Sequence, residues 1–126
     1  MPLKRPAPAA ADAPAVLTKA TLRAATRLGL SSKTLAAVIG VSEATVSRMR
    51  GGSYTLPAGQ KSFELATLFV RLYRSLDAIV GGDDTVAGQW LRNRNLALQA
   101  EPLSLIQTVH GLMNVIQYLD ARRALV

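Results

Sequence analysis

The sequence contains no cysteine and a single histidine, His110. Without cysteine there is no disulfide and no thiolate metal site, and one imidazole by itself cannot form a cluster of metal ligands. The carboxylates are scattered, and no glycine-rich phosphate loop follows a strand. These absences leave no nucleophile assembly and no acid–base pair, so we expect a protein that binds rather than an enzyme, with no cofactor of its own.

Long apolar runs are also missing from the chain. No stretch approaches the roughly eighteen consecutive apolar residues of a membrane span, and the first residues lack the apolar core of a secretion signal. We therefore expect a soluble cytoplasmic protein without a membrane partner. A length of 126 residues suits one ordinary domain or two very small ones.

Positive charge is concentrated in one half of the chain. The formal net charge is +7, but residues 1–74 carry eleven lysines and arginines against three acids, which is +8, whereas residues 75–126 carry four against five, which is −1. A basic half favours a polyanion as partner, because each cation placed against a phosphate releases condensed counterions. The alternative is that these side chains only keep this half in solution.

Proline and alanine dominate the first residues, "MPLKRPAPAAADAP". Few apolar anchors are present there to offset the entropy of ordering, so we expect a flexible N-terminal tail over residues 1–15. An alanine-rich apolar pattern then predicts a helix over Val16–Leu28, which Gly29 ends in the left-handed conformation. Ser31 or Ser32 is expected to cap the next helix.

Two short helices separated by a tight turn are predicted in "TLAAVIGVSEATVSRMRGG", residues 34–52. Apolar residues at helical spacing precede Gly40, which supplies the backbone angles of the turn. Val46 and Met49 lie three residues apart and form the inner face of the second helix. This is the spacing of a helix-turn-helix, whose second helix lies in the major groove of DNA, and we expect the DNA-binding unit over residues 16–61.

The same stretch resembles the Xre/Cro helix-turn-helix family. By the family's pattern, the DNA-facing positions are Ser32, Ser42, Glu43, Ala44, Ser47 and Arg48. Arg48 can bond the O6 and N7 atoms of a guanine, and Glu43 can accept from a cytosine amine. Ser32, Ser42 and Arg50 are better placed for phosphates. Glu43 has a second interpretation, as a carboxylate favoured by the helix dipole in the first turn.

A second group of helices is predicted after the loop "GGSYTLPAGQ". Apolar residues at helical spacing predict a long helix over Phe63–Val80, and Asp83 or Asp84 caps another that ends at Leu91. Pro102 begins a short helix. The last helix has an apolar face made of Leu112, Val115, Ile116 and Leu119.

This half resembles the Xre/MbcA/ParS toxin-binding domain of antitoxins, over residues 62–126. The resemblance rests on Trp90-Leu91, Asn95, Leu98, Pro102-Leu103, Leu105, Thr108, Gly111, Val115 and Leu119. The chain departs from the pattern at Arg94, where the family has proline, and at "AEP", where the family has glycine ahead of a Ser-Pro pair. Trp90, Leu105 and Val115 are expected in the core. Asn95 and Thr108 are expected to bond backbone groups at turns.

Together these features predict an all-α protein, an Xre/Cro-like helix-turn-helix bundle followed by a small helical toxin-binding domain. The resemblance implies a type II antitoxin that represses its own operon and neutralises a toxin of the RES type, for which NAD is the toxin's substrate. A homodimer is expected, because helix-turn-helix proteins usually read palindromic half-sites. The alternative is a plain dimeric regulator of transcription whose C-terminal half only dimerises.

The toxin-binding residues are expected on the last helix, at Leu112, Val115, Leu119, Arg122 and Arg123. An arginine at the end of the chain can pair with polar groups in the toxin's pocket, because its planar fork tolerates desolvation against carboxylates or aromatic rings. The surface around Leu112 to Leu119 can instead cover the mouth of that pocket. The alternative is that both arginines stand in the last turn because cations are favoured beside the negative end of the helix dipole.

Overall fold

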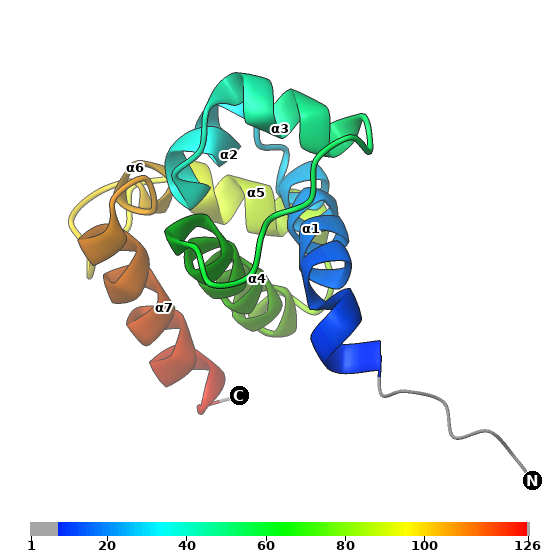
Figure 1. Ribbon diagram of the computed structural model, residues 1–126. Coiled ribbons are helices and arrows are strands. Elements are labelled where there is room, and N and C mark those ends of the chain that lie inside the picture. The colour runs from blue at the N-terminus through cyan, green and yellow to red at the C-terminus, as the bar shows by residue number, and fades with distance from the viewer. Residues whose placement is uncertain (1–7, 126) are drawn as a thin grey trace, which may run out of the picture.

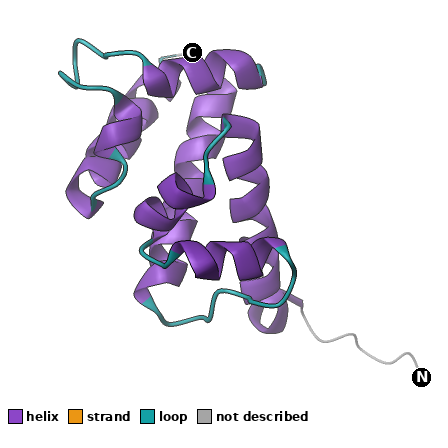
Figure 2. Ribbon diagram, turned by 90° about the horizontal axis from the view of Figure 1, so that it is seen from above, coloured by secondary structure: helices purple, strands orange, loops and turns teal. Residues whose placement is uncertain are grey.

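The computed structural model describes residues 8–125, in which every regular element is a helix (Figure 1, Figure 2). The helices are α1 (Pro8–Leu28), α2 (Ser32–Ile39), α3 (Glu43–Arg50), α4 (Lys61–Ile79), α5 (Asp84–Arg92), α6 (Pro102–Leu105) and α7 (Val109–Arg123). The prediction of an all-α fold is confirmed. None of the helices in this part of the chain combines the length and the apolar character that crossing a bilayer requires.

Helix α1 begins at Pro8 rather than at Val16. The expected tail over residues 1–15 is therefore corrected for residues 8–15, which are helical, whereas residues 1–7 lie outside the described residues. Alanine has the strongest helix propensity of all residues, and the run after Pro8 is rich in it. Proline also suits the first turn of a helix, where its missing N–H has no intrahelical partner to lose. Pro14 lies inside the helix and has no backbone N–H to donate to the preceding turn.

Helices α2 and α3 form the predicted helix-turn-helix, and a serine caps each of them. Ser31 Oγ accepts the N–H of the residue three positions on at 3.1 Å, and Ser42 Oγ does the same at 3.0 Å. Gly40 ends α2 with φ 72°, a conformation in which side chains are strained. A Cβ at Gly40 would also lie 3.3 Å from Leu65 Cδ1 of α4. The turn is therefore pressed against α4, which holds the pair in place.

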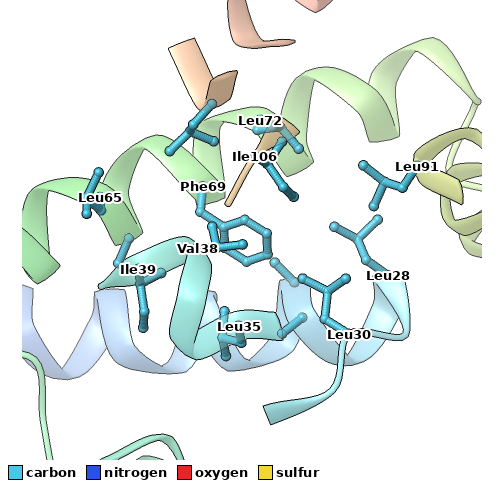
Figure 3. Packing of buried hydrophobic residues seen from close by; sticks show 14 of the residues in the cluster. Leu28, Leu30, Leu35, Val38, Ile39, Leu65, Phe69, Leu72, Leu91 and Ile106 are labelled. Carbon is cyan, nitrogen blue, oxygen red and sulfur yellow. The ribbon is translucent and has the colours of Figure 1, made fainter. Parts of the chain in front are cut away.

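Helix α4 lies at the centre of the molecule (Figure 1) and packs against α1, α2 and α7. The helix extends over Lys61–Ile79, whereas the sequence predicts Phe63–Val80. Its Phe69 ring points between Val38 of α2 and Leu30 before it (Figure 3) and is fully buried. Buried residues of both halves of the chain belong to one cluster. The structure is thus built around a helix that two groups of helices share.

An ion pair and a hydrogen bond join α4 to α7 beside this core. Arg71 forms an ion pair with Asp120 through Nη2 and Oδ2. The hydroxyl of Ser75, which is buried, donates to Oδ1 of the same carboxylate at 3.1 Å. Both oxygens of Asp120 are therefore bonded to α4, and this fixes the last two turns of α7 on it.

The second group of helices is capped as expected. Asp83 Oδ1 accepts the N–H of Val86 at 3.1 Å at the start of α5, and α6 begins at Pro102. Asn95 Oδ1 accepts the N–H of Leu98 at 3.0 Å. Thr108 caps α7, accepting the N–H of the residue three positions on at 3.1 Å. The predicted turn roles of Asn95 and Thr108 are confirmed.

The start of α7 passes so close to α6 that only glycine fits at position 111. A Cβ there would lie 2.7 Å from the carbonyl carbon of Leu105, and closer still to its oxygen. That oxygen also accepts the hydroxyl of Thr108 at 3.3 Å. The contact is between two backbones, so it cannot be relieved by moving a side chain.

Gly111→Ala should lower the free energy of unfolding by about 1–3 kcal/mol, because the methyl group forces α6 and α7 apart. Urea unfolding followed by circular dichroism measures this. Gly51→Ala is the matched control, because Gly51 has φ −79° and a Cβ there comes no closer than 3.5 Å to its neighbours. The control should change stability by less than about 0.5 kcal/mol. Equal stabilities of the two variants would contradict the close approach.

Candidate functional site

Helix α3 presents a polar face to solvent along one edge of the molecule (Figure 1). Val46 and Met49 point inward and are buried, as predicted. The exposed residues of the helix and its cap are Ser42, Glu43, Ala44, Ser47, Arg48 and Arg50. The spacing of the buried pair thus leaves on the outside six of the seven positions that the sequence assigns to DNA contact. The seventh, Ser32, is half-buried on α2.

The Arg48 side chain is held by two neighbours. Its Nη2 donates to Thr45 Oγ1 at 3.1 Å, one turn back toward the start of α3. Its Cζ lies 5.9 Å from the centre of the Tyr54 ring, within the range of a cation–π contact. The guanidinium is thereby directed along the N-terminal half of α3, the part that enters the major groove in a helix-turn-helix protein. Sequence reasoning missed Tyr54, which comes from the loop after α3 and carries no local signal.

Ser32 and Arg50 are brought together although eighteen residues separate them. Ser31 is the residue that caps α2, so the hydroxyl of Ser32 remains available, and it accepts Arg50 Nε at 3.1 Å. A hollow of about 570 Å³ between α1 and the end of α3 is lined by Lys19 as well as by Arg50. These groups suit phosphates better than base edges, because they lie at the C-terminal end of α3 and not at its start.

Further cations lie on α1. Lys19, Arg23 and Arg27 are exposed on it. The hydroxyl of Tyr73 accepts Arg27 Nη1 at 3.3 Å, and this hydrogen bond is the main reason why the pKa of Arg27 is raised above its ordinary value. Like any arginine it is a cation at physiological pH, so it adds to the positive charge of α1.

Three of the five residues expected to contact a toxin are not accessible. Leu112, Val115 and Leu119 are at most 1% exposed, because α7 packs this face against α4. The prediction of a toxin-binding surface at these three residues is therefore wrong. Apolar residues at i, i+3 and i+7 are also the pattern by which a helix packs on a core, and here they form part of the core. Val115 lies in the core, which the sequence analysis also predicts for it.

Arg122 and Arg123 are exposed at the end of α7, as expected, but they have different surroundings. Arg122 Cζ lies 5.9 Å from the centre of the Tyr118 ring. Tyr118 in turn stacks on Trp90 of α5, with ring centres 6.2 Å apart and an angle of 18° between the planes. Arg123 instead lines a groove of about 1080 Å³ between α1, α4 and α7, which Val16 also lines.

Arg92 joins the two groups of helices, and sequence reasoning did not single it out. From the end of α5 it donates Nη1 to the carbonyl of Leu28 at 3.1 Å and Nη2 to that of Gly29 at 2.8 Å. Nη1 also donates to the carbonyl of Gly88 at 2.9 Å. A helix leaves its last carbonyls without intrahelical partners, so Arg92 caps α1 from a distant part of the chain. The turn that leads into the helix-turn-helix is thereby tied to α5.

Two protein-family models match the chain and together cover most of it. Residues 7–71 match the antitoxin Xre-like helix-turn-helix domain. Residues 75–124 match the antitoxin Xre/MbcA/ParS C-terminal toxin-binding domain. No curated protein matches the chain. The exposed face of α3 falls in the first match, and the stacked side chains of α5 and α7 fall in the second.

Arg92→Ala should lower the free energy of unfolding by about 1–2 kcal/mol, because the carbonyls at the end of α1 lose their donors. Arg92→Lys should recover only part of this, since an ammonium does not have the two-pronged geometry that spans the carbonyls of Leu28 and Gly29. Urea unfolding measures both variants. Arg94→Ala, at an exposed arginine two residues on, is the control and should stay within about 0.5 kcal/mol of the wild type. A loss in Arg94→Ala as large as that in Arg92→Ala would argue against the cap.

Proposed function

Since the chain belongs to the antitoxins with an Xre-like helix-turn-helix domain, we propose that it represses its own operon through α3 and neutralises a RES-type toxin by direct binding. The observation that carries this proposal is the presence of both family matches in one chain, each with an exposed set of suitable side chains. NAD is then the substrate of the toxin, and the antitoxin itself needs no cofactor and performs no catalysis.

The DNA side of the proposal assigns different tasks to two arginines of α3. Arg48 reads a guanine, because Thr45 and Tyr54 hold its guanidinium beside the N-terminal half of the helix. Arg50 and Ser32 contact a phosphate near the other end of the helix. Ser42, Ala44 and Ser47 are proposed contacts on the same exposed face, with Ser42 assigned to a phosphate. Glu43 keeps both of its interpretations, a cytosine contact and a partner of the helix dipole.

The division into a DNA-binding part over residues 16–61 and a toxin-binding part over residues 62–126 stays a prediction. Helix α4 packs against α1 and α2 as well as against α7, and the two family matches meet inside it. We therefore treat α4 as shared by both parts. A homodimer is proposed because a palindromic operator requires two copies of α3.

Arg48→Ala should weaken binding to the DNA upstream of the protein's own reading frame by about 1–3 kcal/mol, while non-specific DNA loses much less. Arg50→Ala should weaken binding to both DNAs alike. It should also reduce the slope of the logarithm of affinity against the logarithm of salt concentration by about one, as expected for the loss of one phosphate contact. Fluorescence anisotropy at several salt concentrations measures both variants. Equal losses of Arg48→Ala on the two DNAs would reassign that side chain to a phosphate.

Co-expression with the product of the adjacent reading frame tests the toxin side. We expect the two proteins to purify together and to give a single complex by native mass measurement. The same complex should suppress NAD consumption that the partner shows alone. A chain that purifies stably as a dimer without that partner would favour a plain regulator of transcription instead.

A further inference from the structure

One side of α5 and α7 carries a stack of three side chains, the Trp90–Tyr118–Arg122 stack. The ring centres of Trp90 and Tyr118 lie 6.2 Å apart with 18° between the ring planes, and the Arg122 guanidinium carbon lies 5.9 Å from the Tyr118 ring centre. Both rings are half-buried and Arg122 is exposed. The stack therefore consists of two half-buried aromatic rings that lead to an exposed cation.

Trp90 and Tyr118 pack against the edge of the core, but other contacts also hold α7 in place. Helix α7 already buries Leu112 and Leu119 against α4, and the Asp120 carboxylate ties it there. On α5, Val86 stands one turn before Trp90, so both project from the same face of the helix, and Val86 is 44% exposed. An apolar and aromatic area beside a cation is thus left in contact with water.

We propose that the Trp90–Tyr118–Arg122 stack is the central toxin contact of this antitoxin, and that it receives a carboxylate of the toxin flanked by apolar side chains. This inference rests on the proposed function. Tryptophan, tyrosine and arginine are the residue types that dominate the energetics of protein interfaces. All three lie inside residues 75–124, which match the toxin-binding domain. The exposed guanidinium supplies the charge that selects a carboxylate.

The ring makes Arg122 a better anchor than its neighbour. Tyr118 stands one turn before Arg122 and restricts the guanidinium, so less conformational entropy is lost when the toxin binds. Arg123 instead lines the groove between α1, α4 and α7, together with apolar residues such as Val16 and the charged side chain of Arg74. The two adjacent arginines therefore belong to different surfaces, and a toxin centred on the stack depends on Arg122 more than on Arg123.

The test uses the full-length chain and the product of the adjacent reading frame, with the Kd measured by isothermal titration calorimetry. Arg122→Ala and Tyr118→Ala should each raise the Kd about tenfold or more. The double variant should raise the Kd by less than the product of the two single fold-changes, because the two side chains act as one unit. Tyr118→Phe keeps the ring and should stay within about twofold of the wild type. Arg94→Ala, an exposed arginine of the same half outside the stack, should also stay within about twofold.

Two comparisons locate the contact. Arg123→Ala should weaken binding less than Arg122→Ala does, and Val16→Glu, at a 63% exposed position of the groove, should leave the Kd nearly unchanged. Thermal melting of every variant shows whether it is folded, and the variants on α7 and Arg94→Ala should retain DNA binding. Val16 also lines the hollow that Lys19 and Arg50 share, so Val16→Glu is compared for toxin binding alone. If Arg123→Ala or Val16→Glu costs more than Arg122→Ala, the groove is the toxin site and the inference is wrong.

The remaining outcomes also decide the matter. If the wild type binds the partner and Arg122→Ala binds it equally well, the proposed function stands and the stack is overturned as its contact. If the wild type does not bind the partner, the proposed function fails and the inference fails with it. If Tyr118→Ala instead converts a dimer of the free chain into a monomer, the stack is an interface between two antitoxin copies, which also overturns the inference.

Discussion

Burial of α4 on two sides is the constraint on which the rest of the structure depends. Helices α2 and α3 have eight residues each, and helices of that length are not stable in water without packing. Phe69 supports α2, on which α3 packs, from one side of α4 (Figure 3), while Arg71 and Ser75 hold Asp120 of α7 on another. Removing α4 from either group of helices would expose a buried apolar face, so neither group is complete without it.

The proposed partner surfaces consequently belong to one folded body. Arg92 adds a second link. From the end of α5 it donates hydrogen bonds to the carbonyls at the end of α1, just before the helix-turn-helix. The exposed face of α3 and the Trp90–Tyr118–Arg122 stack are nevertheless different surfaces on different helices. A cut at residue 62 would preserve the side chains of both surfaces but divide the core that positions them. Point variants therefore separate the two functions better than fragments do.

Local signals in the sequence predicted much of the architecture. Serine, aspartate and threonine caps, the left-handed Gly40 and the first-turn Pro102 act within a few residues of themselves, so their effects are visible before the chain is folded. The start of α1 differs from the prediction because residues 8–15 contain both prolines, which disfavour a helix, and alanines, which favour one. The residues of α3 that the sequence predicts to contact DNA lie on its exposed face, because Val46 and Met49 determine which side is buried.

The sequence by itself thus determined the helices, their caps, the helix-turn-helix and the separation of positive charge into one half. It did not determine which apolar face would meet a partner, because Leu112 and Leu119 have the same spacing whether they pack on α4 or on a toxin. Only the tertiary structure decided that α4 would cover this face. It also brought Arg92 to α1 and Tyr118 to Trp90, since contacts between residues far apart in the chain leave no periodic pattern in it.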